Sequence, residues 1–374
     1  MSGPRNNPVR VLIAGGGTGG HVFPALAIKQ AIVRKTPQAQ VIFAGTASGL
    51  EAKVMPREGE TLKTFWISGF SRRHVLQNLL LPLKLAVSFS QSLKLLLSFR
   101  PQVVIGTGGY VMGPVLWTAQ KLGIPTVLQE QNSHPGWTTR ALAPKAGMVC
   151  LGFEEAKARL GSARMEFTGN PLRLSFREED SREARQRWTL DPSRRTVLVF
   201  GGSAGARSIN QAIAGALENL TAVFNVIWQT GRLGVPESAN QHLIEAANHS
   251  GNLKVLEFID DMPGAYAVSD LAICRAGAMT LAELAMTGVP AVLIPYPFAT
   301  DDHQTANAKA VETRGAALLI KDADLTSQNV FSAVQHCMSS EEVLSSMSIK
   351  MKSLAHPEAA SRIADIALSL TEKP

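Results

Sequence analysis

Acidic residues are missing from one long stretch of this 374-residue chain: no Asp or Glu occurs between Glu60 and Glu130. Residues 1–153 carry sixteen Lys and Arg against four acids, a net charge of +12, so the remainder must carry −5 of the total of +7. This asymmetry indicates that the first half of the protein faces something anionic. Aromatic residues are also scarce, at 6%, which argues against a nucleic-acid-binding module, because base stacking needs aromatic rings.

Cysteine is rare, and its placement excludes two classes of protein. Cys150, Cys274 and Cys337 are widely spaced and form no CxxC or CxxH pattern. We therefore expect neither a disulfide framework nor a zinc site, and no metal site of any kind, in a protein of the reducing cytoplasm. Residues 1–7 are polar and do not resemble a signal peptide, and we expect no apolar run long enough to cross a bilayer.

Two apolar runs end in glycine-rich loops, one in each half of the chain. Residues 9–14 precede Gly15–Gly20, and residues 195–200 precede Gly201–Gly205. Glycines permit a sharp turn and a close approach of ligand to backbone, and the amides at the start of a following helix form an anion site. With 45% hydrophobic residues over this length, the repeat predicts two Rossmann-like domains with a cleft between them.

Short apolar runs alternate with helical patterns in both halves, which is typical of parallel α/β sheets. We expect helices at Pro24–Arg34, Tyr110–Leu122 and Glu358–Leu370, and a hinge near Thr168–Arg173, where Gly and Pro interrupt regular structure. Strands are expected at Val9–Ala14, Gln40–Ala44, Val103–Gly106, Thr126–Gln129, Met148–Leu151, Val197–Phe200, Asn225–Gln229, Leu253–Glu257, Leu271–Cys274 and Ala291–Ile294.

The stretch 75–99 is crowded with apolar side chains, and all its charges are basic. Pro82 and Lys84 interrupt it, so we expect that it does not span a membrane. Apolar side chains beside Lys and Arg suit a surface that dips into the lipid headgroup layer. The alternative is a buried helix pair on the outside of the sheet; we expect one face in the core and the other at the membrane.

The first glycine loop also matches the dinucleotide fingerprint as Gly15-x-Gly17-x-x-Gly20. That interpretation needs an acidic residue at the end of the second strand to bind the ribose. The second strand ends in Ala44-Gly45-Thr46, which disfavours a nicotinamide or flavin enzyme.

The second glycine loop matches the G-x-S-x-G pattern of serine hydrolases around Ser203. Asp260 or Asp261 and His303 follow in the hydrolase order. A serine hydrolase is therefore the rival hypothesis, although it leaves the first glycine loop and His21 without a role.

Two further positions have both a structural and a functional interpretation. Thr280 and Glu283 have the spacing of a helix capping box, but after Gly277 they could equally hold a diphosphate and a ribose. His21 could be an ordinary helix-start residue, but its position directly after the first glycine loop also suits a role in proton transfer.

Seven motifs occur along the chain in the order of one known family. The chain resembles the MurG family of glycosyltransferases in Gly15-Gly16-Gly17-Thr18-Gly19-Gly20-His21, Gly108-Gly109-Tyr110, Glu130-Gln131-Asn132, Gly169-Asn170-Pro171-Leu172-Arg173, Gly201-Gly202-Ser203-Ala204-Gly205-Ala206, Arg275-Ala276-Gly277-Ala278 and Asp302-His303-Gln304-x-x-Asn307-Ala308. Thr139, where the family usually has Asn, and Met112, in place of a smaller residue, depart from the pattern near the acceptor loop.

The resemblance implies a GT-B fold with two Rossmann-like domains, residues 1–170 joined by a C-terminal helix at about 355–374, and residues 171–354. It implies an inverting transfer of N-acetylglucosamine (GlcNAc) from UDP-GlcNAc to polyprenyl-diphosphate-linked MurNAc-pentapeptide, without a cofactor. The expected location is peripheral, on an anionic membrane surface at the cytoplasmic face of the bacterial inner membrane. Contacts with other cell-wall synthesis proteins are also expected.

The resemblance also implies roles for individual residues. His21 is the candidate catalytic base, Ile259 would receive the uracil, and Glu283 the ribose. Gly17, Thr18, Gly109 and Tyr110 would face the acceptor and its diphosphate. The full set expected to bind UDP-GlcNAc is Thr18, Gly19, Gly20, Asn132, Arg173, Ser203, Ile259, Ala278, Met279, Thr280, Glu283, Gln304 and Asn307.

Overall fold

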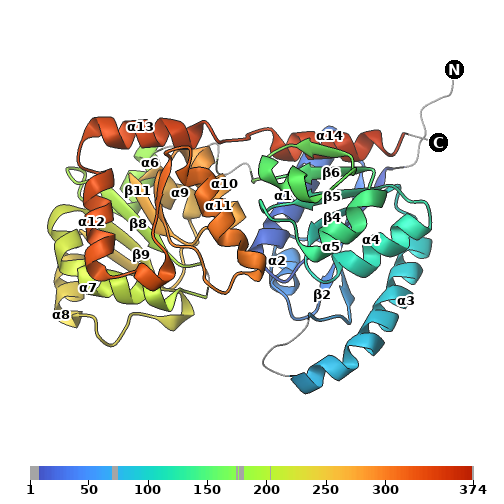
Figure 1. Ribbon diagram of the computed structural model, residues 1–374, viewed down its shortest axis with the longest axis horizontal. Helices are drawn as coiled ribbons and strands as arrows, with labels where there is room; N and C mark the ends of the chain where they lie inside the picture. Colours follow the sequence, from blue (N-terminus) through green and yellow to red (C-terminus); the bar gives the residue numbers. More distant parts are fainter. Residues whose placement is uncertain (1–7, 70–74, 174–175, 177–180, 203, 373–374) are drawn as a thin grey trace. The chain divides into compact units, whose positions relative to one another are not determined.

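The computed structural model describes residues 8–69, 75–173, 176, 181–202 and 204–372. The chain divides into two compact units, the first formed by Met1–Arg173 with His356–Pro374 and the second by Leu174–Ala355. Figure 1 shows a sheet flanked by helices in each unit. The division follows Arg173, the last residue of the segment in which the sequence predicts a hinge.

The first unit is built on a seven-stranded parallel sheet in the order β3-β2-β1-β4-β5-β6-β7. Its strands are β1 (Arg10–Gly15), β2 (Gln40–Thr46), β3 (Leu62–Phe65), β4 (Val103–Gly108), β5 (Thr126–Glu130), β6 (Met148–Leu151) and β7 (Met165–Phe167). The strand order reverses between β1 and β4. In such sheets ligands bind beyond the carboxyl ends of the strands at this switch point.

Alternate residues of β1 pack into two separate cores, one on each face of the sheet. Val11 and Ile13 pack with α1 (Gly19–Lys35) and α14 (Ala359–Ser369), whereas Leu12 and Ala14 pack with α4 (Met112–Lys121). The C-terminal helix α14 therefore belongs to the core of the first unit. The other helices of this unit are α2 (Glu51–Arg57), α3 (Leu81–Phe99) and α5 (Trp137–Leu142), with short 3-10 turns at Val75–Leu80, Ala143–Lys145 and Glu154–Arg159.

The second unit repeats the design with six parallel strands in the order β10-β9-β8-β11-β12-β13. These are β8 (Thr196–Phe200), β9 (Asn225–Gln229), β10 (Leu253–Leu256), β11 (Leu271–Cys274), β12 (Ala291–Leu293) and β13 (Ala317–Leu319). Here the order reverses between β8 and β11, so the loops after these strands form the switch point. The helices are α6 (Ser181–Trp188), α7 (Arg207–Val223), α8 (Gln241–His249), α9 (Met262–Ala267), α10 (Ala278–Thr287), α11 (His303–Glu312), α12 (Ser327–Cys337) and α13 (Glu341–Lys352).

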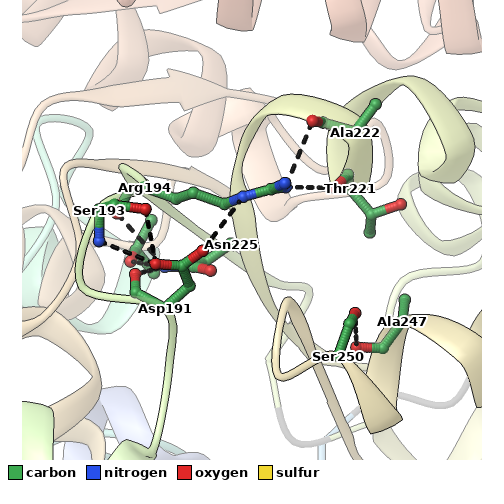
Figure 2. A network of polar contacts seen from close by, with 9 residues as sticks. Asp191, Ser193, Arg194, Thr221, Ala222, Asn225, Ala247 and Ser250 are labelled. Atoms are coloured by element: carbon green, nitrogen blue, oxygen red, sulfur yellow. Dashed lines mark hydrogen bonds and ion pairs between the residues drawn. The ribbon is translucent and has the colours of Figure 1, made fainter.

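The turn that leads into β8 is held by a polar network at the end of α7 (Figure 2). Arg194 Nη1 donates to the carbonyl oxygens of Thr221 (2.7 Å) and Ala222 (3.2 Å). A cation at this position satisfies the last carbonyls of α7 and complements the helix dipole. Asn225 Nδ2 donates to Asp191 O (2.8 Å), which ties the start of β9 to the same turn.

The predicted fold class is confirmed by the two parallel, doubly wound sheets. All ten predicted strands exist, with ends that differ by at most two residues, and three further strands occur: β3, β7 and β13. Each of these three lies at the edge of its sheet and has only three or four residues.

The segment around α3 corrects the prediction that no apolar run is long enough to cross a bilayer. The helical stretch Asn78–Phe99 has 22 residues and a hydropathy of 1.3, so by length and composition it could cross a bilayer. Pro82 does not interrupt the helix because it lies in its first turn, where its missing N–H would have no helical partner. Only 17% of its most apolar window is buried; Ser88, Ser92 and Leu96 form its buried positions, and Phe89 packs edge-on against Trp117 with ring centroids 5.0 Å apart.

Candidate functional site

The switch point of the first unit brings two glycine loops into contact. Gly16 N donates to Gly108 O (3.3 Å), and a Cβ on Gly109 would lie 2.5 Å from Gly16 O. A Cβ on Gly108 would lie 2.4 Å from Cδ2 of His21 and 2.7 Å from its Nε2. The loop after β4 therefore packs directly on the histidine ring, and only glycine leaves room for this approach.

His21 is the third residue of α1 and is fixed by the loop that precedes it. Its Nδ1 lies 2.8 Å from Gly16 O and 3.4 Å from Thr18 Oγ1, and its own carbonyl accepts from Thr107 Oγ1 (3.0 Å). A carbonyl oxygen can only accept, so Nδ1 must carry the proton. The neutral ring then has its lone pair on Nε2, the nitrogen beside Gly108.

Glu51, the first residue of α2, is a residue of this site that the sequence analysis missed. Its side chain is fully buried, and its carboxylate accepts from Gly17 N (2.6 Å), Thr46 N (2.7 Å) and Thr46 Oγ1 (2.7 Å). Burial raises the pKa of Glu51, but the hydrogen bonds from Gly17 and Thr46 outweigh it and leave the pKa below its ordinary value. The group is therefore a buried carboxylate anion beneath the glycine loop.

The remaining first-unit candidates lie on the loops around this centre. Thr18 is the N-cap of α1, and Gly19 and Gly20 begin the helix. Tyr110 is 61% exposed. Asn132 N and Nδ2 both donate to the buried Glu130 (3.1 and 3.3 Å), so the turn after β5 is held by its own carboxylate.

Arg173 contacts an aromatic ring, and Met112 and Thr139, the two positions that depart from the family pattern, are part of the packed interior. The Arg173 guanidinium stacks 4.8 Å from the Phe23 ring centroid, on α1. Met112 and Thr139 are both buried. The methionine fills the space beside Gly106, where a Cβ would lie 2.7 Å from its side chain.

In the second unit, Gln229 joins the glycine loop to the segment around Ile259. Gln229 Nε2 donates to Gly202 O (3.1 Å), and Ile259 N donates to Gln229 Oε1 (2.9 Å). Gly205 packs on Thr230, whose carbonyl oxygen would lie 2.2 Å from an added Cβ. Ile259 is buried. Ser203, the nucleophile of the rival hydrolase hypothesis and a member of the expected UDP-GlcNAc set, lies outside the described residues.

The loop after β11 leads into α10, and its geometry excludes one of the two interpretations of Thr280. The helix begins at Ala278, with Gly277 as N-cap and no side-chain cap. Thr280 is therefore inside the first turn, so the capping-box interpretation is wrong. The backbone amides of Ala278, Met279 and Thr280 belong to the first turn, where the N–H groups have no helical partner and favour an anion.

Glu283 lies one turn further along α10 and is oriented by a second residue that the sequence analysis missed. Tyr266 is fully buried on α9, and its hydroxyl donates to Glu283 Oε2 (3.0 Å). Its burial and the neighbouring Glu283 charge raise the pKa of Tyr266 well above its ordinary value, so this hydroxyl stays protonated as a donor.

A cluster of polar side chains fixes the loop after β11. Arg275 Nη1 donates to Asp322 Oδ1 (2.5 Å), and Nη2 donates to Ser208 Oγ (2.9 Å). Asn307 is fully buried, and its Nδ2 donates to Ala276 O (3.4 Å). Gln304 Oε1 accepts from Tyr296 N (3.0 Å).

Each unit thus carries a separate chemical capacity at its own switch point. The first unit presents a tautomerically fixed histidine between two glycine loops, which suits proton transfer to or from a hydroxyl. The second presents a helix N-terminus followed by an oriented carboxylate, which suits a diphosphate joined to a ribose. Asp261, a residue of the rival hydrolase hypothesis, caps α9 by accepting from Gly264 N (3.0 Å) and pairs with Arg187 (3.2 Å).

Comparison with known proteins gives matches over both units. Residues 11–150 match the N-terminal domain of glycosyltransferase family 28, and residues 196–363 match its C-terminal domain. The chain is 42% identical to the UDP-N-acetylglucosamine–N-acetylmuramyl-(pentapeptide) pyrophosphoryl-undecaprenol N-acetylglucosamine transferase of Chlorobium luteolum, over 98% of this chain and all of that protein. It is 40% identical to the transferase of the same name from Myxococcus xanthus, over 97% of this chain and 93% of that protein. The crystal structure of Acinetobacter baumannii MurG superposes with a TM-score of 0.74 at 31% identity, covering 97% of this chain and 100% of that one.

Proposed function

The chain belongs to the MurG family of glycosyltransferases, and from this premise we propose how its own residues carry out the family's reaction. The protein is an N-acetylglucosaminyltransferase with the two-domain GT-B fold. It transfers GlcNAc from UDP-GlcNAc to the 4-hydroxyl of MurNAc in undecaprenyl-diphosphate-MurNAc-pentapeptide (lipid I). The products are UDP and β-1,4-linked lipid II. The observation that carries this assignment is the similarity to transferases of this activity over nearly the whole chain.

We assign the catalytic base to His21. Inversion at the anomeric carbon proceeds by one in-line attack, so a base must take the proton from the attacking 4-hydroxyl. The hydrogen bond from Nδ1 to Gly16 O (2.8 Å) supports this role, because it leaves the basic lone pair on Nε2. Such a base contributes about 10²- to 10⁴-fold to the rate.

The donor is assigned mainly to the second unit. The amides of Ala278, Met279 and Thr280 at the start of α10 would hold the diphosphate, and Glu283 would accept from both ribose hydroxyls. The backbone near Ile259 would receive the uracil. The other residues of the proposed donor set are Thr18, Gly19, Gly20, Asn132, Arg173, Ser203, Gln304 and Asn307.

The leaving UDP gains negative charge as the glycosidic bond breaks. The amides at the start of α10 and the cationic Arg173 are the groups proposed to stabilise this charge, so that the reaction needs neither a cofactor nor a metal ion. The experiment is a titration with EDTA during turnover. Unchanged activity is expected, and a loss restored by a divalent cation would contradict the proposal.

The acceptor is assigned to the first unit, with Gly17, Thr18, Gly109 and Tyr110 facing its diphosphate. We further propose that the protein binds peripherally to the anionic cytoplasmic face of the bacterial inner membrane through the surface around α3, and meets other cell-wall synthesis proteins there. Exposed side chains on this helix and the short turn before it support the proposal; they are Leu79, Leu80, Leu83, Leu85, Leu93 and Leu97.

The assigned reaction is tested directly by incubating the protein with UDP-GlcNAc and a lipid I analogue. Release of UDP together with a product one GlcNAc heavier is the expected result. UDP release that does not depend on the acceptor would indicate hydrolysis of the donor instead.

A further inference from the structure

One peptide unit in the first glycine loop is held at both ends by ionisable side chains. The peptide between Gly16 and Gly17 accepts through Gly16 O from Nδ1 of His21 (2.8 Å). It also donates through Gly17 N to Oε2 of Glu51 (2.6 Å). The carboxylate, the peptide and the imidazole therefore form one continuous hydrogen-bonded chain.

Glycines around the Glu51 side chain leave the space that lets its carboxylate reach the loop. A Cβ added at Gly16, Gly45 or Gly49 would lie 2.3, 2.5 or 2.2 Å from an atom of the Glu51 side chain. Three glycines, one in the loop after β1 and two at the end of β2 and in the turn that follows, thus leave the space that the side chain occupies. Oε1 is held by Thr46 N and Thr46 Oγ1 (both 2.7 Å), so Oε2 remains directed at Gly17.

The position of His21 explains why a buried anion is useful there. His21 lies in the first turn of α1, where the helix dipole disfavours a positively charged ring, and this turn contains no acidic residue. A base must accept a proton and become positively charged. The Glu51 carboxylate accepts a hydrogen bond from Gly17 N–H, which polarises the peptide and makes Gly16 O a stronger acceptor for Nδ1–H. This stabilisation of the protonated ring offsets the unfavourable effect of the α1 helix dipole.

We propose that Glu51 is a positioning residue for His21 that acts through the Gly16–Gly17 peptide, fixing the imidazole tautomer and raising its basicity. The arrangement has the logic of a carboxylate–histidine dyad with a peptide bond between the two side chains. The proposal rests on the proposed role of His21 as the base. It assigns to Glu51 no contact with either substrate.

The test is the Glu51→Gln variant, which keeps the shape of the side chain but removes its charge. Other ionisable groups on the surrounding elements include Tyr110 after β4, Glu130 at the end of β5, His134 in the loop after β5, Lys53 on α2 and Arg173 beside α1, and this variant leaves all of them in place. We expect the turnover number to fall by about 10- to 100-fold, as when an outer hydrogen-bond partner of a metal-bound histidine is removed. The KM for UDP-GlcNAc should stay nearly constant.

The pH dependence separates positioning from mere structural support. Without the Glu51 charge the His21 cation is less stable, so the acidic limb of the kcat–pH profile should move down by about half a pH unit to one unit. The midpoint of the His21 imidazole signal in an NMR titration should move in the same direction. An unmoved profile and an unmoved NMR midpoint in a folded Glu51→Gln protein would overturn the proposal.

Glu60→Gln is the matched control. Glu60 is also a largely buried carboxylate of the first unit, but it pairs with Lys29 (2.6 Å). It should lower thermal stability without moving either midpoint. If Glu60→Gln moved both midpoints as far as Glu51→Gln, the effect would be general electrostatics and the proposal would be wrong.

A further measurement needs no variant at Glu51 and covers the case in which Glu51→Gln does not fold. In the wild-type protein the amide signal of Gly17 should titrate with the midpoint of the His21 ring, and this response should vanish in His21→Gln. A Gly17 amide that ignores the ring's titration would overturn the proposal. These NMR results do not depend on catalysis: if His21→Ala retained normal turnover, the base assignment would fail while the coupling could still be observed.

Discussion

At the scale of single residues, proton transfer is the step for which His21 is proposed. His21→Ala should lower kcat by about 10²- to 10⁴-fold with little change in the KM for UDP-GlcNAc, since a base acts in the transition state rather than in donor binding. Steady-state kinetics at saturating acceptor measures this. Near-normal kcat at saturation would remove His21 from the role and direct the search to other side chains of the first unit.

The Tyr266–Glu283 pair makes a second prediction at this scale. Tyr266→Phe removes only the hydroxyl that donates to Glu283 (3.0 Å) and keeps the ring packed against Phe200, with centroids 6.0 Å apart. We expect a rise in the KM for UDP-GlcNAc of roughly fivefold, corresponding to about 1 kcal/mol for one hydrogen bond, with kcat unchanged. Glu283→Ala is the comparison and should raise KM further, because it removes the charged group itself. A Tyr266→Phe enzyme with wild-type KM would show that Glu283 needs no help to be oriented.

A site residue could be predicted from the sequence when it lies close along the chain to the residues that it contacts. His21 was predictable because it adjoins its own glycine loop. Glu51 was not, because its contact with Gly17 spans 34 residues and no local pattern marks it. Thr280 and Glu283 were ambiguous until the start of α10 was known, because the capping-box interpretation requires Thr280 at the N-cap and the observed N-cap, Gly277, lies three residues earlier.

At the scale of elements, the predicted strands include every central strand but only one edge strand, β10, whereas the edge strands β3, β7 and β13 were missed. The central strands β1, β4, β8 and β11 are buried on both faces of their sheets and give continuous apolar runs. In contrast, β3 reads Leu-Lys-Thr-Phe and β7 has no buried residue. Short, half-exposed edge strands lack the apolar run on which such a prediction depends.

The exposed leucines of the segment before α3 give a prediction about this element. Leu79 and Leu80 are 77% and 47% exposed, so replacing both with Ser should weaken vesicle binding without lowering the melting temperature. The matched control is Leu96→Ser on the buried side of the helix, which should destabilise the unit by about 2–5 kcal/mol. Sedimentation with vesicles at high salt and thermal unfolding measure the two effects. A large drop in melting temperature for the Leu79/Leu80 variant would show that these side chains support the core.

The ion pair that joins α14 to β7 predicts an acid-sensitive contact within the first unit. Arg362 donates to both carboxylate oxygens of Glu166 (2.5 and 2.9 Å), and these hydrogen bonds lower the pKa of Glu166. A lowered folded-state pKa means that the stabilisation is present above the unfolded-state pKa and is lost as the pH falls through the folded-state value. Glu166→Gln should therefore cost about 0.5–1 kcal/mol at pH 7, given the partial exposure of the pair, and almost nothing at an acidic pH well below the lowered folded-state pKa.

Urea unfolding at the two pH values measures that difference. Glu154→Gln is the control, because Glu154 pairs with Lys157 on the surface (2.8 Å), where an ion pair contributes little. An equal cost for Glu166→Gln at both pH values would show that α14 is held by its apolar contacts alone.

At the scale of the whole molecule, the two units repeat one topology but divide the charge unequally. The acid-free residues 61–129 include β3, α3, β4 and α4, all in the first unit. Each unit places its glycine loops at its own switch point, yet among the residues that the structure describes only the first unit has a long, apolar and mostly exposed helix, and this helix lies in the acid-free stretch. Repetition of the fold thus supplies two edges at which ligands can bind, and the differences in charge and hydropathy are the basis for proposing the acceptor at the first unit and the donor at the second.

This division predicts how the protein binds membranes. Each basic residue near an anionic leaflet contributes about 1 kcal/mol, which salt screens, whereas inserted leucines contribute an apolar part that salt leaves in place. Replacing Lys84, Lys94 and Lys121 with Gln should weaken binding to anionic vesicles at low salt, yet leave activity on a short-chain, water-soluble acceptor nearly intact. The same change at Lys309, Lys350 and Lys352 of the second unit is the matched control and should leave vesicle binding as it was. Equal binding of the wild-type protein to neutral and anionic vesicles at low salt would contradict the proposed electrostatic contribution to membrane binding. Basic side chains are attracted to an anionic leaflet but not to a neutral one, so this contribution requires stronger binding to anionic vesicles.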